Sequence, residues 1–345
     1  MNNDLMKKGH GGKPGLYKKA ASFFCELIMN GIVVIDKPSG KTSHDVVEDV
    51  KKALLVKKAG HAGTLDPMAT GVLPVCLEEA TKLVQFLSTD TKDYTATMLL
   101  GVKTDTQDIE GKIIARDDLH IMHEDIENIF YRFVGEIEQV PPRYSAVKYR
   151  GKSLYKWARQ GIAIEPPRRI IEIYDLRIDE VKLPYVTFRV SCSKGTYVRS
   201  LCSDIGEMLG CGACLASLRR TRSGSFFEAS AISLDALDNT AGIRPPDHII
   251  SLIDAIPHIP AIYVDHAFAR KLREGYQPVA ETLRIYHIPS LAAGDMVKFI
   301  DKDSNLVSIA KMLCASDRID STDGKRQAAR IVRIFNTDKQ TYGRH

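Results

Sequence analysis

The stretch YVTFRVSCSKGTYVRSLCSDIGEML, residues 185–209, decides the fold class of the chain. Val186, Phe188 and Val190 alternate with polar residues, which predicts a strand with one buried face. Lys194-Gly195 then predicts a turn. The apolar residues that follow recur at helical spacing; they are Val198, Leu201, Cys202, Ile205 and Met208. A half-exposed strand that leads into an amphipathic helix is typical of a sheet with helices packed on one side.

Other segments repeat these two patterns. GIVVIDKP (31–38) predicts a buried strand, and DYTATMLLG (93–101) predicts a strand with alternating burial. Helical spacing of apolar residues predicts further helices after Thr42, which we expect to be an N-cap, and over 80–87 and 123–135. Because strands and helices are mixed without strict βαβ alternation, we expect an α+β fold with a mixed, largely antiparallel sheet.

The chain is long enough for two domains. The apolar patterns are interrupted at DNTAGIRPPDH (238–248), a segment that contains Pro and Gly. Beyond it, segment 294–312 has the pattern of a β-hairpin with polar residues at its turn. We therefore predict four parts: a flexible, basic and Gly-rich extension (1–29), a main catalytic domain (30–240), a linker (241–260) and a small β-rich C-terminal domain (261–340).

Composition narrows the class of partner only slightly. The net charge is +5 and the sequence pI is about 8.7, which favours an anionic partner such as nucleic acid, although many metabolic enzymes are equally basic. The seven cysteines are odd in number and mostly lie in apolar patterns, so we expect reduced thiols and a cytoplasmic protein. No apolar run approaches the ~20 residues of a membrane span, so no membrane partner is expected.

The sequence contains only weak matches to metal-binding and nucleotide-binding motifs. Cys211-Gly-Ala-Cys214 lacks the second ligand pair that a zinc site normally needs, and the ten histidines have no ligand spacing. PSGKTS (38–43) resembles the end of a phosphate-binding loop, but the glycine required five residues before Gly40 is Ile35. We therefore expect neither a metal ion nor a bound nucleoside triphosphate.

The loop GHAGTLDPMATGVLPV (60–75) contains three glycines, two prolines and the single carboxylate of Asp66. Such a rigid loop fixes the direction of a side chain, which suits catalysis, but an ordinary turn also uses Gly, Asp and Pro. The residues of the loop alone leave both interpretations open.

Polar residues also occur where other apolar patterns stop. These are Asp36-Lys37-Pro38 after a strand, Tyr94 at the start of a strand, and Arg199 in the first turn of a helix. In a sheet protein these residues and Asp66 could converge on one cleft. Helix caps and surface ion pairs would explain the same pattern.

Basic residues cluster in two regions. One is Leu218-Arg219-Arg220-Thr221-Arg222, and the other is PPRYSAVKYRGKSLYKWARQG (141–161), where Lys and Arg alternate with aromatic residues. This mixture suits a phosphate backbone with exposed bases. A solvated helix face over an aromatic core explains it as well, and we expect Trp157 to belong to such a core.

Five segments, in order, resemble the TruB family of tRNA pseudouridine synthases. They are GIVVIDKPSGKTSHDVV (31–47), GHAGTLDPMATGVLPVCLEEATKLVQFL (60–87), KDYTATMLLGVKTDTQDIEG (92–111), PPRYSAVKYRGKSLYKWARQG (141–161) and CSKGTYVRSLCSDIG (192–206). The resemblance implies the pseudouridine synthase fold with a PUA-like RNA-binding domain at the C-terminus. It also implies isomerisation of uridine 55 in the T-loop of tRNA, with base flipping and without a cofactor.

The resemblance also implies roles for single residues. Asp66 matches the nucleophile, Tyr94 the tyrosine that stacks on the flipped base and takes part in proton removal, and Arg199 the arginine that pairs with the aspartate. Lys37 and Pro38 match residues that brace the site, His61 one that contacts the T-loop, and Leu218 one in the uracil pocket. The basic cluster itself, rather than the resemblance, predicts that Arg219 and Arg220 bind tRNA. We expect Arg199 to lower the pKa of Asp66. The resemblance leaves open whether Asp66 attacks C1′ of the ribose or adds to the base.

Two further functions stay open at this point. The guide-RNA-dependent relatives share the aspartate loop, but segments 101–111 and 141–161 resemble the stand-alone bacterial type, which binds tRNA directly. A helper of tRNA folding, in which catalysis is secondary, is the other alternative. We expect a monomer whose partner is the T-arm of tRNA.

Overall fold

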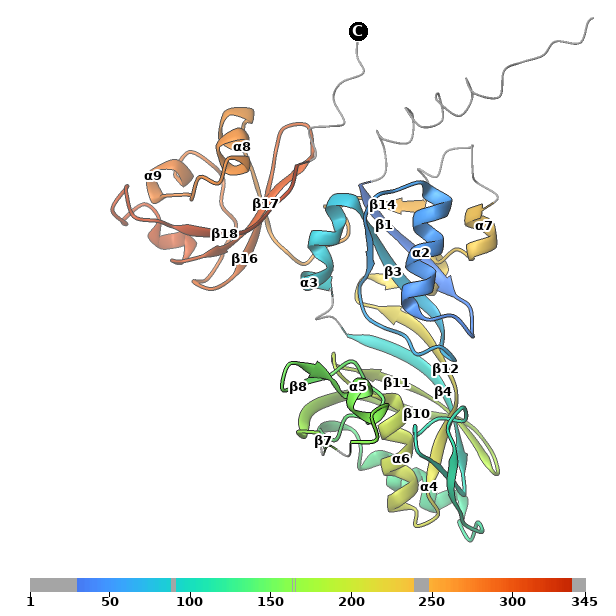
Figure 1. Cartoon of the computed structure of the whole chain (residues 1–345). Coiled ribbons are helices and arrows are strands. Elements are labelled where there is room, and N and C mark those ends of the chain that lie inside the picture. Colours follow the sequence, from blue (N-terminus) through green and yellow to red (C-terminus); the bar gives the residue numbers. More distant parts are fainter. Residues whose placement is uncertain (1–29, 88–90, 163, 165, 239–247, 337–345) are drawn as a thin grey trace, which may run out of the picture.

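The computed structural model describes residues 30–87, 91–162, 164, 166–238 and 248–336, and its main feature is one long sheet (Figure 1). In spatial order its strands are β14 (Ile249–Ile250), β1 (Gly31–Lys37), β3 (Thr70–Leu77), β12 (Ala213–Ser223), β4 (Lys92–Leu100), β11 (Tyr185–Cys192), β10 (Arg169–Lys182) and β7 (Gly135–Gln139). Two short strands, β2 (Ala59–His61) and β13 (Phe226–Phe227), pair with β3 and β12. Neighbours in the main order are antiparallel except β3 and β12, which are parallel. The predicted α+β class with a mixed, largely antiparallel sheet is confirmed.

Helices cover one face of this sheet. They are α2 (Ser43–Leu54), α4 (His123–Tyr131) and α6 (Val198–Met208), and their apolar faces share one core with the inward side chains of the strands. Thr42 caps α2 as predicted, because its Oγ1 accepts from the amide of Asp45 at 3.1 Å and the Asp45 carboxylate accepts from the amide of Thr42 at 2.9 Å. The shorter elements are α3 (Val84–Leu87), α5 (Leu154–Ala158), α7 (Leu234–Asp238), β5 (Val102–Thr104), β6 (Ile113–Arg116), β8 (Lys148–Tyr149), β9 (Lys152–Ser153), and the 3₁₀ turns η1 (Glu78–Leu83), η2 (Glu228–Ser230) and η4 (Ser316–Arg318).

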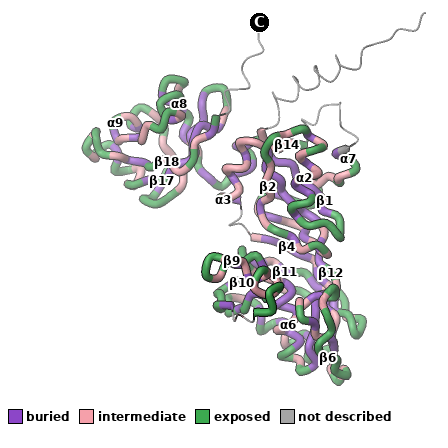
Figure 2. The backbone as a smooth tube through the Cα atoms, in the orientation of Figure 1, coloured by how far each residue is buried: buried purple, intermediate pink, exposed green. Residues whose placement is uncertain are grey.

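The two halves of the sheet differ in how their second face is covered. On the β4–β11 half this face is polar, and the hydroxyls of Thr97 and Thr187 lie 3.1 Å apart across the two strands. On the β1–β3 half, η1, α3 and residues after 250 bury the second face in another apolar cluster. The expectation of helices on one side is therefore right for the β4–β11 half only. Figure 2 shows the buried residues concentrated along the strands.

The C-terminal part forms a four-stranded sheet of its own. Its order is β15 (Ala261–Tyr263), β16 (Met296–Ile300), β17 (Leu306–Met312) and β18 (Ala329–Ile334), with helices α8 (His266–Arg273) and α9 (Ala280–Leu283) packed on it. The hairpin expected over 294–312 is present as β16 and β17. Residues 1–29, where we expect a flexible extension, lie outside the described residues.

The C-terminal sheet is attached firmly to the main sheet. Phe335, just after β18, is fully buried in the same cluster as Ile32 and Val34 of β1. The buried ammonium of Lys298 donates to the carbonyls of Ile253 and Ile256 at 3.1 and 3.0 Å. The second half of the predicted linker 241–260 is thus packed between the two sheets, and β14 extends the edge of the main one. The domain boundaries themselves stay a prediction. Among the described residues, no helix has the length and hydropathy to cross a membrane.

Phe335→Ala tests this attachment. We expect the free energy of unfolding to fall by about 3–5 kcal/mol, because the substitution opens a cavity in the cluster between the two sheets. The control is Phe227→Ala, since Phe227 is 53% exposed and should lose about 1 kcal/mol or less. Calorimetry measures both; equal losses would contradict the role of Phe335.

Candidate active site

A cavity of about 650 Å³ opens over the middle of the main sheet, beside the loop that carries Asp66. Its lining includes the predicted residues Asp66, Tyr94, Arg199, His61, Leu218 and Arg220. Of the remaining predicted residues, Lys37 and Arg219 lie behind the loop and contact its backbone or its strand, and Pro38 is exposed next to it. The structure thus brings Asp66, Tyr94 and Arg199 to one cleft, as one of the two interpretations expects, whereas Asp36-Lys37-Pro38 does not line it.

Asp66 and Arg199 form an ion pair in this cavity. The Nε and Nη2 atoms of Arg199 lie 2.9 and 3.2 Å from the two carboxylate oxygens of Asp66. Burial nevertheless raises the pKa of Asp66, and the nearby charge of Arg199 only partly opposes this effect. The net shift of the Asp66 pKa is therefore upward, so the expectation of a lowered pKa is wrong. The charge of Arg199 by itself lowers this pKa, as expected.

A second carboxylate holds the other side of the same guanidinium. Arg199, 4% exposed, donates through Nη1 to Asp108 Oδ2 at 3.3 Å and to the carbonyl of Thr106 at 3.1 Å, and through Nη2 to the carbonyl of Tyr144 at 3.0 Å. Asp108 is 5% exposed, and its charge also raises the pKa of Asp66. The sequence analysis did not single out Asp108. The segment GVKTDTQDIEG (101–111) carries three carboxylates, Asp105, Asp108 and Glu110, and their spacing gives no signal that Asp108 is the buried one.

Lys37 braces the loop from below. Its side chain is fully buried, and its ammonium donates to the carbonyls of Pro38, Pro67 and Ala69 at 2.9, 3.0 and 2.7 Å. Burial lowers the pKa of Lys37 to about 8, with the charge of Asp66 opposing. This contact fixes the chain directly after Asp66.

Three of the predicted residues present aromatic or apolar surfaces to the cavity. Tyr94 is 7% exposed on β4, and burial raises the pKa of its phenol. Leu218 is 8% exposed on β12. His61 lines the cavity with its ring partly buried, and this burial lowers its pKa. Together they form a surface on which a planar base can lie.

Arg219 and Arg220 differ from each other. Arg219 is half-buried, with its guanidinium 3.0 Å from both carboxylate oxygens of Asp36, and it also pairs with Glu228. Arg220 is buried and points into the protein. That these two residues bind RNA stays a prediction.

Sequence reasoning also missed the group that fixes the start of α6. Gln139 is 1% exposed, and its amide donates to the carbonyl of Tyr197 at 3.1 Å and accepts from the amide of Tyr197 at 2.8 Å. The hydroxyl of Ser200 donates to the carbonyl of Val140 at 3.0 Å. The end of β7 thus holds the first turn of α6, which carries Arg199. Tyr197 itself lines the cavity.

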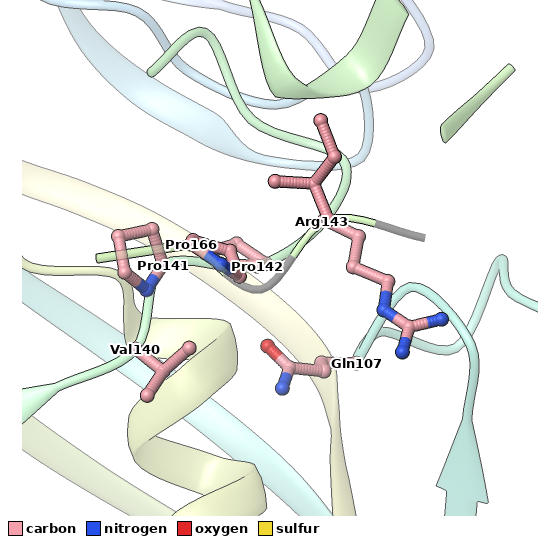
Figure 3. Close-up of a pocket in the computed structure, with 7 residues that line it drawn as sticks. Gln107, Val140, Pro141, Pro142, Arg143 and Pro166 are labelled. Carbon is pink, nitrogen blue, oxygen red and sulfur yellow. The ribbon is translucent and has the colours of Figure 1, made fainter. Parts of the chain in front are cut away.

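A second cavity, of about 440 Å³, lies next to this contact (Figure 3). Three prolines (141, 142 and 166) and Val140 form its apolar walls, with the polar groups of Gln107 and Arg143 at one side. Gln107 also accepts a hydrogen bond from Ser200 at 2.9 Å, so this cavity borders the residues that hold Arg199.

The aromatic and basic segment 144–161 forms a small module at the rim. Three cations lie over aromatic rings within it, at 5.4 Å for Arg150 on Tyr149, 4.4 Å for Lys152 on Trp157 and 5.5 Å for Arg159 on Tyr155. Trp157 is half-buried beneath Lys152 and is not part of the described apolar cores, so its interpretation as a core residue is wrong. Within the described part of the chain, no three His, Cys, Asp or Glu side chains are grouped to hold a metal ion.

Comparison with known proteins identifies the family. The TruB family pseudouridylate synthase N-terminal domain matches residues 51–198, and the tRNA pseudouridylate synthase B C-terminal domain matches 199–245. A protein of Syntrophus aciditrophicus named tRNA pseudouridine synthase B is 52% identical over 89% of this chain and 99% of its own length. The chain belongs to the TruB family. Its counterpart of the same name in Geobacter sulfurreducens is 43% identical over 89% of this chain and 100% of its own length.

Solved structures agree with this TruB assignment. Chains from a Cbf5-Nop10-Gar1 complex and from an H/ACA RNP bound to a substrate RNA match with TM-scores of 0.70 and 0.68. They are 31% and 30% identical, and each match covers 90% of this chain and 86% of the other. As a TruB-family pseudouridine synthase, this chain is an isomerase, and the resemblance seen in the five sequence segments is confirmed.

Asp108→Asn tests the second carboxylate. We expect turnover to fall by roughly 10²-fold, because Arg199 loses the ionised group that fixes it opposite Asp66. The acid limb of the pH–rate profile should move to lower pH, since a negative charge that raises the pKa of Asp66 is removed. Asp105→Asn, in the same loop but exposed, is the control. Equal rates for the two variants would contradict the role of Asp108.

Lys37→Met tests the buried ammonium through stability. The native pKa of about 8 lies below the ordinary value of 10.5, so the unfolded chain binds more protons between these pH values. The free energy of unfolding of the wild type should therefore rise, relative to that of the variant, by up to about 3 kcal/mol as the pH increases through this range. Urea unfolding of both proteins across that range measures the difference. Parallel curves would refute the lowered pKa.

Proposed function

We propose that this chain is a stand-alone tRNA pseudouridine synthase that converts uridine 55 of the T-loop to pseudouridine. The observation that carries the proposal is the Asp66 carboxylate, paired with Arg199 inside a cavity large enough for a flipped uridine. The relatives named tRNA pseudouridine synthase B, which align over almost their whole length, support tRNA as the substrate.

The reaction needs no atoms from outside the substrate. The C1′–N1 bond breaks with its electron pair left on the uracil, the uracil turns, and C5 forms a new bond to C1′. A proton then leaves C5 and N1 gains one, so product and substrate are isomers. Because the atoms balance in this way, we propose that no cofactor takes part.

We assign Asp66 as the nucleophile, Tyr94 as the base-stacking and proton-removing residue, and Arg199 as the partner of Asp66. A carboxylate must be ionised to act as a nucleophile, and Arg199 opposes the effect of burial on its pKa. Flipping the uridine costs a few kcal/mol of lost stacking, which the ring of Tyr94 would offset. His61 and Leu218 would contact the base and its vacated position, and Lys37 and Pro38 would hold the loop that aims the carboxylate.

The rim module favours the stand-alone form over a guide-dependent one. In segment 144–161 basic side chains lie over half-buried aromatic rings at the rim of the cavity, a mixture that suits direct contact with tRNA. The solved relatives include Cbf5 from H/ACA complexes, but the identity is higher to the proteins named tRNA pseudouridine synthase B. We propose residues 30–240 as the catalytic domain, 241–260 as the connection and 261–340 as a PUA-like RNA-binding domain.

We also propose that the protein acts in the cytoplasm, as a monomer. Its described cysteines are free, and all but Cys314 are buried, which suits a reducing compartment.

Purified protein alone, incubated with a T-arm stem-loop, tests the proposal. We expect pseudouridine at position 55 with the wild type, and a rate lowered by more than about 10³-fold with Asp66→Asn, which keeps the shape of the side chain but not its charge. Asp175→Asn, on the polar face of β10, is the control that should retain activity. Modification that requires an added guide RNA would favour the guide-dependent alternative. Full rescue of tRNA folding by Asp66→Asn would favour the folding helper.

A further inference from the structure

Arg220 occupies a central position in the main sheet. It is 1% exposed on β12, where it lies opposite Tyr94 of β4 on one side and opposite Gly71 of β3 on the other. Strand β4 carries the proposed stacking residue, and β3 begins directly after the Asp66 loop. Arg220 is therefore the residue of β12 that lies between Tyr94 and the end of the Asp66 loop.

The guanidinium of Arg220 hydrogen-bonds to the chain both before and after Asp66. Its Nη2 and Nη1 donate to the carbonyls of Gly63 and Thr64 at 3.1 and 3.4 Å, and its Nε donates to the carbonyl of Val72 at 2.7 Å. A guanidinium spreads its N–H donors over three nitrogens and can reach carbonyls on separate segments, whereas the three donors of an ammonium share one nitrogen.

The backbone is shaped to approach this residue. Gly71 has a φ of +97°, and a Cβ built there would lie 2.2 Å from the carbonyl oxygen of Arg220. Only glycine allows β3 to come this close to β12 at the end of the loop. The close approach is what brings the carbonyl of Val72 within reach of the side chain.

Arg220 has no carboxylate at ion-pair distance in the described parts of the chain, and three of its hydrogen bonds go to backbone carbonyls. It also reaches the cavity: its charge and a hydrogen bond to the phenol oppose the rise in the pKa of Tyr94, and its charge lowers the pKa of His61. A buried cation without a carboxylate partner favours negative charge nearby.

We propose that Arg220 is a positioning residue that fixes the Asp66 loop against β4, so that Asp66 and Tyr94 face the same nucleotide, and that it does not bind tRNA phosphate. This proposal rests on the proposed function. It replaces the sequence-based expectation for Arg220, while Arg219, whose side chain is 35% exposed, keeps that expectation.

The test compares Arg220→Met and Arg220→Lys with the neighbouring variant Arg219→Met. We measure the single-turnover rate constant of pseudouridine formation at saturating enzyme, where a loss of folded protein lowers the amount of active enzyme but not the rate constant. For Arg220→Met we expect a decrease of roughly 10²-fold. Arg220→Lys should lose roughly tenfold, because an ammonium restores the charge but reaches fewer carbonyls.

Affinity separates positioning from phosphate binding. The Kd for the T-arm, measured with Asp66→Asn present in every variant, and its dependence on salt should stay unchanged on replacing Arg220. A phosphate contact predicts the opposite result: a weaker Kd, a salt slope smaller by about one, and an unchanged rate constant at saturation. That outcome would overturn the proposal. If Arg220→Met does not fold, a wild-type rate constant for Arg220→Lys overturns it equally.

A measurement that does not use activity keeps this proposal distinct from the proposed function. Hydrogen exchange in the free protein should become faster for the amides of residues 63–72 in Arg220→Lys, while helix α8 in the C-terminal domain stays unchanged. Wild-type protein that forms no pseudouridine would refute the proposed function alone. Unchanged exchange in the loop would refute the role of Arg220 whatever the activity.

Discussion

The rest of the site depends on keeping a negative charge on a carboxylate that is largely shielded from water. Burial raises the pKa of Asp66, and a second buried carboxylate, Asp108, raises it further. The charge of Arg199 opposes both effects and that of Lys37 opposes them more weakly. Lys37 donates to the carbonyls of Pro67 and Ala69, so it also fixes the loop that carries Asp66, whereas Arg199 is itself fixed by the carbonyls of Thr106 and Tyr144. Electrostatics and positioning are therefore served by the same contacts.

The sheet explains how residues far apart in the chain reach one cavity. Strand β12 pairs in parallel with β3 and antiparallel with β4, so the chain after residue 213 is inserted between two strands that come much earlier. This insertion sets Leu218 and Arg220 between the Asp66 loop and Tyr94. Helix α6 approaches from the other side, with its start held by Gln139 at the end of β7. Tyr94 thus sits on a strand of this sheet, and the loop of Asp66 and the helix of Arg199 are each held by a residue on another of its strands, Arg220 and Gln139.

The sequence predicts the parts of this arrangement that depend on local patterns. Alternation in 93–101 and 185–192 predicts β4 and β11, and the glycines and prolines around Asp66 predict a rigid loop. It cannot predict which arginine of Leu218-Arg219-Arg220-Thr221-Arg222 points inward. Apolar and polar residues do not alternate in this segment, and the pairing with β4 shifts register between Arg220 and Arg222. The contacts of Asp108 and Gln139 join residues 91 and 58 positions apart, which spacing along the chain does not encode.

Strand β3 also connects the site to the C-terminal sheet. Its residues Leu73 and Val75 face the core beneath the cavity, whereas Val72 and Cys76 face the cluster that contains Phe335. The loop of Asp66 leads directly into this strand, and Arg220 holds the strand at Val72. Strand β3 thus packs against the cluster that anchors the C-terminal sheet and leads out of the loop of Asp66. Under the proposed function, the packing of residues 249–259 against the main sheet would hold an RNA bound by the C-terminal domain at a set distance from Asp66.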